Sequence, residues 1–123
     1  VSNNAITAYE ILWEAAQKGM ETAKPGNTCA DVSNAMSKIL TKNNSISYSV
    51  GRMGHGVGLQ VTEPPSIMKN DNTLLQENMI IAIEPSLEYA PGVMLVQEEN
   101  ILITNNGCEI LTSRTPIKMP IIF

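Results

Sequence analysis

The residue types best suited to chemistry in this chain are one histidine and a few glutamates on apolar segments. His55, the only histidine, lies in the glycine-rich segment GHGVG, Glu84 ends the apolar run MIIAIE, and the pair Glu98 and Glu99 interrupts another apolar stretch. Carboxylates on apolar strands are costly to bury alone, and a shared cation offsets that cost. Because strand residues alternate, one of the pair points inward and the other outward. One imidazole with two carboxylates is a ligand set suited to Mn, Co, Fe or Zn.

Each of these residues also has a plain structural explanation. A lone histidine in a turn is often solvated, and a glutamate near a strand end usually faces water. The three glycines around the histidine could suggest a phosphate loop, but no Lys-Ser or Lys-Thr follows them and no helix pattern begins there. Glycines also allow the backbone to approach closely and to adopt left-handed conformations around His55. Residue types alone therefore leave a metal site and a solvated turn both open.

Two helices are predicted ahead of this segment. Apolar residues recur at gaps of three and four from Ile6 to Ala23, the period of a helix with one buried face, and a Pro-Gly pair then ends it. In the second helix Thr28 is a plausible N-cap, and Asp31 three residues later suits a capping box. An apolar helical face follows, and the segment 41–45 is predicted to end it.

From residue 46 onward the pattern changes to short apolar segments bounded by polar residues, glycine or proline, which indicate strands. The predicted strands are 45–50, 57–61, 78–86, two strands within 86–104 that are joined at Ala90-Pro91-Gly92, and, after a turn at 105–107, 108–113. The apolar, proline-interrupted tail 115–123 is expected to pack against another domain or subunit. Helices followed by antiparallel strands predict an α+β fold, with the helices covering one face of a curved sheet.

Composition narrows the class of protein. The 123 residues, 43% of them hydrophobic, suit one domain with an apolar core. A net charge of −4 with scattered basic residues argues against nucleic acid as a partner. We expect no membrane span and no secretory signal, hence a cytoplasmic protein. Cys29 and Cys108 are expected to be free thiols. The first residue is not Met, which favours a piece of a longer chain.

The segments GHGVGLQVTEPPSI, IAIEPS and EENILIT resemble, in order and form, those of the creatinase/aminopeptidase P/methionine aminopeptidase superfamily (M24), whose members share the pita-bread fold. The intervals of 29 residues from His55 to Glu84 and of 14 from Glu84 to Glu98 look most like those of microbial Xaa-Pro dipeptidases, or prolidases. The helical segment ending in KPGNT is similar to the one that precedes the site in those enzymes. The resemblance implies that residues 1–123 are the C-terminal part of a single pita-bread catalytic domain.

The resemblance also implies roles by position. His55 and Glu84 would be ligands of one metal ion, and Glu98 would bridge two divalent ions in the intact domain, with Glu99 as its outward neighbour. In the family a bridging solvent molecule attacks the amide carbon, and Glu84 by position would take its proton. The implied protein is a metal-dependent hydrolase of small peptides or small amides, and a homodimer.

Two departures from the family pattern keep alternatives open. The family uses five ligands, and the two aspartates expected on an earlier strand are absent. The acidic residues ahead of His55 all lie on predicted helices, so the chain is expected to have an incomplete site and to be inactive alone; they are Glu10, Glu14, Glu21 and Asp31.

The second departure concerns substrate binding. Many family peptidases carry a second histidine seven residues after the first, where this chain has Thr62. Thr62 and Arg52 flank the site as candidate substrate-binding residues. The threonine leaves room for a small-molecule C–N hydrolase of the same fold, similar to ectoine hydrolase or creatinase. A non-catalytic pita-bread binding module is a third possibility. The retention of His55, Glu84 and Glu98 argues against that module, because charges on apolar strands otherwise have no purpose.

Overall fold

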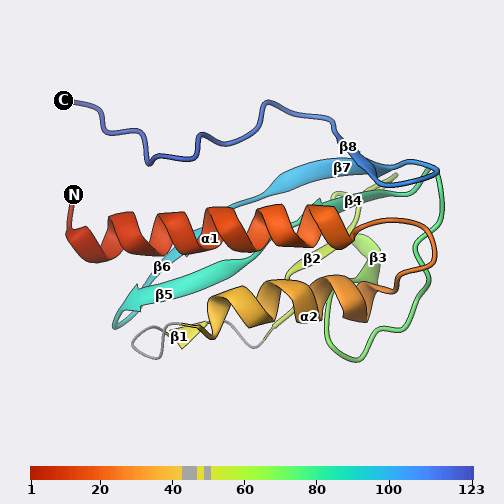
Figure 1. The fold of residues 1–123 in the computed structure, drawn as a ribbon, viewed down its shortest axis with the longest axis horizontal. Coiled ribbons are helices and arrows are strands. Elements are labelled where there is room, and N and C mark those ends of the chain that lie inside the picture. Colours follow the sequence, from red (N-terminus) through yellow and green to blue (C-terminus); the bar gives the residue numbers. More distant parts are fainter. Residues whose placement is uncertain (43–46, 49–50) are drawn as a thin grey trace.

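Two helices pack on an antiparallel sheet in the computed structural model, which describes residues 1–42, 47–48 and 51–123 (Figure 1). The helices are α1 (Asn3–Thr22) and α2 (Cys29–Leu40). The strands are β1 (Ser47–Tyr48), β2 (Gly54–Gly56), β3 (Glu63–Ser66), β4 (Ile80–Ile83), β5 (Ser86–Ala90), β6 (Val93–Val96), β7 (Glu99–Ile103) and β8 (Cys108–Ile110). The predicted α+β class is confirmed.

The strands form two antiparallel sheets. The larger has the order β3-β2-β4-β7-β8, and the smaller has the order β1-β5-β6. Helix α1 packs against α2 and against β4, β5 and β6, so it spans both sheets. The core between the helices and the sheets is apolar, and its largest fully buried side chains include Leu12, Met36, Ile81 and Ile101. The strands that carry the candidate site, β2, β4 and β7, are the three central strands of the larger sheet.

Both helices confirm the helical pattern of the sequence. Helix α1 is buried more widely than the gaps of three and four predict, because Ala8, Leu12 and Ala15 are also inaccessible to water. Helix α2 begins with the predicted capping box: the Thr28 hydroxyl accepts from the Asp31 backbone N–H, and the Asp31 carboxylate accepts from the Thr28 backbone N–H. Helix α2 ends at Leu40 with Thr41 as its C-cap, which confirms the predicted end in the segment 41–45, and Asn43 and Asn44 lie outside the described residues.

Thr28→Ala is expected to lower the free energy of unfolding by about 1 kcal/mol, because a backbone N–H in the first turn of α2 loses its acceptor. The same motif adds a pH dependence. The backbone N–H and the hydroxyl of Thr28 hold the pKa of Asp31 below its usual range. The stabilisation by the carboxylate is therefore fully present above the unfolded pKa, about 4, and is lost as the pH falls through the folded pKa.

Urea unfolding, followed by circular dichroism at neutral pH and at successively lower pH, measures both effects. Thr22→Ala is the matched control, because the Thr22 hydroxyl also sits at a helix end but only donates to the Lys18 carbonyl. We expect the control to change the free energy of unfolding by less than about 0.5 kcal/mol. An equal loss in the two variants would contradict the role assigned to the cap.

Some of the predicted strands are confirmed and others are wrong. Strand β4, the turn at Ala90-Pro91-Gly92 between β5 and β6, and β8 after 105–107 are confirmed. The strand predicted at 57–61 is wrong, because residues 58–61 form bends with Leu59 and Val61 exposed, and β2 lies earlier, at Gly54–Gly56. The single strand expected after Gly92 is divided into β6 and β7, which belong to different sheets. Of the predicted strand 45–50, only Ser47–Tyr48 is described, as β1.

The C-terminal tail returns along α1 as irregular backbone, and the two chain ends lie at the same end of the molecule (Figure 1). Tyr9 and Trp13 of α1 donate hydrogen bonds to the carbonyls of Pro116 and Thr115, so the start of the tail packs on the chain's own helix. Phe123 is exposed at the end. Packing of these last residues on another domain or subunit stays a prediction.

Two further expectations concern membranes and thiols. Neither α1 nor α2 has the length and apolar character that crossing a membrane requires. Cys29 and Cys108 are free thiols, as predicted. Burial, with a smaller effect of the Asp71 charge, raises the pKa of Cys29 to about 11, so this thiol remains protonated at neutral pH.

Candidate metal centre

Strand pairing brings the three candidate ligands to one end of the larger sheet. Ile83, the last residue of β4, pairs with Gly54 of β2 on one side and with the first residue of β7 on the other. Glu84 directly follows β4, and Glu98 directly precedes β7. Because the strands are antiparallel, the end of β4 and the start of β7 lie side by side, next to His55 on β2.

The side chains converge as well as the strands. One donor atom from each of His55, Glu84 and Glu98 lies within 4.8 Å of the others. His55 Nε2 is 3.5 Å from Glu84 Oε2. His55 is only 5% exposed, whereas the Glu84 side chain is 35% exposed and Glu98 is exposed. The cluster thus has a buried imidazole at its base and carboxylates toward its open side.

The imidazole is held in one orientation. His55 Nδ1 is 3.0 Å from the carbonyl oxygen of Gly56. A carbonyl oxygen only accepts hydrogen bonds, so this contact requires the proton of a neutral ring to sit on Nδ1. The lone pair is then on Nε2, the nitrogen that faces Glu84. Fixing a histidine through its other ring nitrogen is how proteins commonly orient a metal ligand.

Glycines flank His55 because the neighbouring strands leave no room for a side chain. A Cβ atom at Gly54 would overlap the carbonyl oxygen of Ala82 on β4, and the φ angle of Gly54 is 152°. A Cβ atom at Gly56 would overlap the carbonyl oxygen of Pro64. The close approach expected from the sequence is therefore confirmed at both positions, and it brings β2 tightly between β3 and β4.

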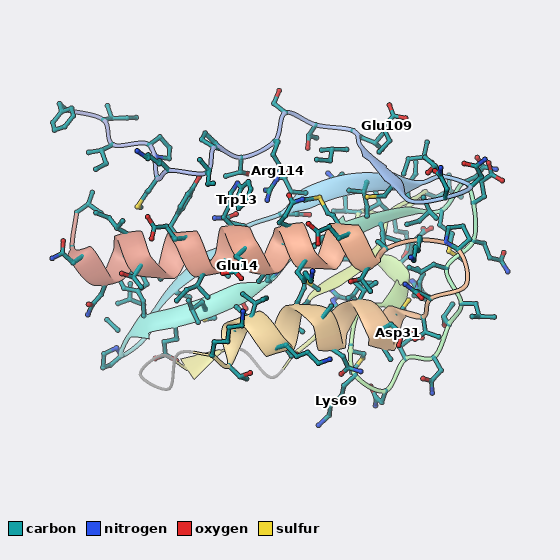
Figure 2. All side chains as sticks on the ribbon, in the orientation of Figure 1. Trp13, Glu14, Asp31, Lys69, Glu109 and Arg114 are labelled. Atoms are coloured by element: carbon teal, nitrogen blue, oxygen red, sulfur yellow. The ribbon has the colours of Figure 1, made fainter. Side chains whose placement is uncertain are left out.

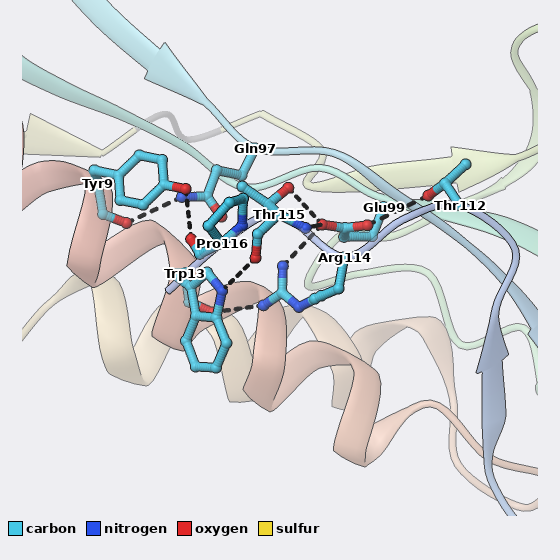
Figure 3. Close-up of polar contacts among 8 residues, drawn as sticks. All are labelled: Tyr9, Trp13, Gln97, Glu99, Thr112, Arg114, Thr115 and Pro116. Atoms are coloured by element: carbon cyan, nitrogen blue, oxygen red, sulfur yellow. Dashed lines mark hydrogen bonds and ion pairs between the residues drawn. The ribbon is translucent and has the colours of Figure 1, made fainter. Parts of the chain in front are cut away.

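The two adjacent glutamates point to opposite faces, but Glu99 is not an outward neighbour. Glu99 is 1% exposed and receives hydrogen bonds from Arg114 Nη1 at 2.8 Å, from the Thr115 backbone N–H at 3.0 Å and from the Thr115 hydroxyl at 2.6 Å (Figure 3). Burial alone would raise the pKa of Glu99, but the bonds from Thr115 and Arg114 outweigh it and hold the pKa below its usual range.

Glu99 is buried because the chain returns over it near the C-terminus. Glu98, directly before β7, and Glu99, its first residue, lie on opposite faces as alternation predicts, but Thr112, Arg114 and Thr115 rather than water meet Glu99. Figure 2 shows Arg114 and Trp13 between α1 and the tail. Sequence reasoning missed Arg114 and Thr115 as partners of Glu99. The available signal was Arg114 itself, a charged residue directly before the tail 115–123.

Arg52 and Thr62, the candidate substrate-binding residues, are both exposed. Arg52 precedes β2, and Thr62 ends the run of bends between β2 and β3. Their exposure leaves both side chains free to meet a ligand, and their role in substrate binding stays a prediction.

The acidic residues of the helices do not join the cluster. Across residues 1–42, 47–48 and 51–123, His55, Glu84 and Glu98 are the one group of three such side chains close enough to hold a metal ion. Glu10, Glu14 and Glu21 lie on α1, and Asp31 lies on α2, as predicted. The donor set itself fits a divalent ion, because it combines one oriented imidazole nitrogen with two carboxylates.

The fold and the cluster together define the class of protein. Residues 1–105 match the family model of metallopeptidase family M24, and the chain belongs to that family. Its fold is part of the pita-bread fold, and membership implies binding of divalent metal. Among individual proteins, the chain is 40% identical over 105 residues to an Xaa-Pro dipeptidase of Pyrococcus furiosus, covering 85% of this chain and 30% of the relative.

The chain is also similar to solved structures of such enzymes. Prolidase from Pyrococcus furiosus is 37% identical with a TM-score of 0.82, over 89% of this chain and 33% of that one. Dipeptidase PepE from Mycobacterium ulcerans is 31% identical with a TM-score of 0.86, over 96% of this chain and 32% of that one. The chain thus spans about a third of the length of these relatives.

Proposed function

We propose that these residues belong to a metal-dependent hydrolase that cleaves an amide bond, of the Xaa-Pro dipeptidase type. The observation that carries the proposal is that donor atoms of His55 on β2, of Glu84 just after β4 and of Glu98 just before β7 lie within 4.8 Å of one another. Membership of family M24 and the similarity to Xaa-Pro dipeptidases support it. Since the chain covers a third of those relatives, the substrate is part of the proposal.

The candidate residues have different proposed roles. His55, Glu84 and Glu98 would hold divalent metal of the kind Mn, Co, Fe or Zn, and the family resemblance proposes Glu98 as the carboxylate that two ions would share. Bound metal supplies a Lewis acid for the substrate carbonyl and lowers the pKa of water. Glu84 is the catalytic base, since its partly exposed carboxylate can accept the proton of the attacking water. Arg52 and Thr62 are the proposed contacts for a substrate carboxylate.

A second candidate is a hydrolase of the same fold that acts on a small non-peptide C–N bond. The observation in its favour is Thr62, which stands where many peptidases of the family carry a histidine. A threonine hydroxyl can donate one hydrogen bond, but it cannot act as an imidazole acid. A non-catalytic binding module is the least favoured reading, because the oriented His55 and the paired strands preserve a donor set that binding alone does not need.

Hydrolysis should be measured on the natural protein that carries these residues, supplied with Mn²⁺ or Co²⁺. We expect Xaa-Pro dipeptides to be cleaved in preference to ectoine-like and creatine-like substrates. Glu84→Gln should lower kcat/KM by about 100-fold or more, because a general base contributes about 10² to 10⁴ in rate. The matched control is Glu109→Gln, since Glu109 is an exposed glutamate on β8 (Figure 2). Cleavage of the small substrates alone would favour the second candidate, and no metal-dependent turnover of either kind would contradict the proposal.

A further inference from the structure

Glu98 and Glu99 are chemically identical neighbours with different environments. Successive residues of an extended strand point to opposite faces, and a shift of one residue in pairing exchanges those faces. Such a shift in β7 would bury Glu98 and turn Glu99 toward the metal cluster. Since the two side chains are chemically the same, their chemistry does not determine which of them faces the metal cluster. Contacts on the opposite face of the strand must determine it.

Three residues near the C-terminus, Thr112, Arg114 and Thr115, donate hydrogen bonds that only one of the two glutamates can accept. Glu99 Oε1 accepts from Arg114 and from the backbone and hydroxyl of Thr115, while Oε2 lies 3.4 Å from the Thr112 hydroxyl (Figure 3). These donors lie on the helix-covered side of β7. These donors need a carboxylate on this side of the strand to accept their hydrogen bonds, and Glu99 is that carboxylate.

The tail is in turn fixed to α1. Arg114 Nη2 donates to the Trp13 carbonyl at 3.2 Å, and its guanidinium carbon is 4.5 Å from the centre of the Trp13 ring. Trp13 Nε1 donates to the Thr115 carbonyl at 2.9 Å. The guanidinium is thus held by a carboxylate, a carbonyl and an aromatic face at once, which is a geometry suited to arginine.

The residue on the other side of Glu98 is also tied to α1. Gln97 is buried, and its Nε2 donates to the Tyr9 carbonyl at 3.0 Å (Figure 3). Its backbone N–H donates to the Pro85 carbonyl at 3.2 Å. Glu98 therefore lies between two residues whose side chains are anchored on the helix side, while its own side chain faces the cluster.

We propose that Glu99 is a positioning residue: the network of Glu99, Arg114, Thr115 and Trp13 sets the register of β7, so that Glu98 is the glutamate presented to His55 and Glu84. This inference rests on the proposed metal site. Fixing register is the best-attested use of a buried ion pair, which contributes little net stability by itself. Groups behind the ligands commonly change metal affinity by about 10- to 100-fold when they are altered.

The 123-residue chain offers two built-in probes for the test. His55 is the only histidine and Trp13 the only tryptophan, so the imidazole ring protons report on the cluster and the indole N–H reports on the network. The chain is titrated with MnCl₂, and the paramagnetic broadening of the His55 ring signals in NMR gives the affinity. The variants are Glu99→Gln and the milder Thr115→Val, which keeps the backbone N–H and the Arg114 bond. Glu98→Gln is the reference for a lost ligand, and Glu109→Gln is the control.

We expect Glu99→Gln and Thr115→Val to weaken Mn²⁺ binding by about 10-fold and to shift the Trp13 indole signal. Glu98→Gln should weaken binding without moving Trp13, and Glu109→Gln should change neither. Urea unfolding of each variant verifies that binding is compared between folded chains, and Thr115→Val carries the test if Glu99→Gln does not fold. Wild-type affinity in the folded network variants, with Glu98→Gln impaired, would overturn the positioning role and leave the proposed function intact. Paramagnetic broadening detects weak and partial occupancy, so the three donors of this incomplete site are enough to produce it. Wild-type His55 signals that Mn²⁺ leaves unaffected would therefore overturn the metal site and this inference together.

Discussion

Arg114→Met is expected to lower the free energy of unfolding by about 3–5 kcal/mol, among the largest losses from one substitution in this chain. Removing one partner of a buried ion pair leaves the other charge without compensation, which costs about that much. Glu99 is 1% exposed and would retain only the bonds from the tail threonines. Trp13 would also lose the cation above its ring. Urea unfolding followed by Trp13 fluorescence measures the loss.

Arg52→Met is the matched control, because Arg52 is exposed, and we expect it to change stability by less than about 0.5 kcal/mol. Arg114→Lys should fall between the two, since a lysine keeps the charge but cannot make the two directed Nη contacts and the stacking together. Equal stability of the Arg114→Met and Arg52→Met variants would show that the network contributes nothing to the fold.

Gly54→Ala is expected to lower the free energy of unfolding by about 3 kcal/mol or more and to separate His55 from Glu84. The added methyl group would overlap the backbone oxygen of Ala82, which cannot rotate away, at a φ angle of 152° that side chains rarely adopt. Relief requires β2 to move away from β4, and His55 moves with it. Urea unfolding gives the stability, and the Mn²⁺ broadening of the His55 ring gives the effect on the cluster.

Two other glycines supply graded controls. Gly107→Ala meets nothing within 4 Å and is expected to cost less than about 0.5 kcal/mol. Gly26→Ala also has open space but a φ angle of 92°, so it isolates the conformational cost, about 1–2 kcal/mol. A Gly54→Ala variant that behaves like Gly107→Ala would contradict the close packing of β2 on β4.

The local patterns that succeeded are those with an immediate physical cause. The capping box at Thr28 needs only residues three apart, and the period of α1 reflects burial of one face. The failed strand at 57–61 shows the limit of such reasoning. The apolar residues of this segment predicted a strand, but Leu59 and Val61 remain exposed because β4 pairs with the shorter segment Gly54–Gly56.

The sequence by itself determined the ligand candidates, His55, Glu84 and Glu98, because their types and intervals are properties of the chain. It also determined that Glu98 and Glu99 face opposite ways, since alternation is local to a strand. Only the tertiary structure decided what lies on each face. Arg114 and Thr115 reach Glu99 from 15 and 16 residues away, along a tail held by α1. Such contacts depend on where the chain returns in space, and no local period encodes that.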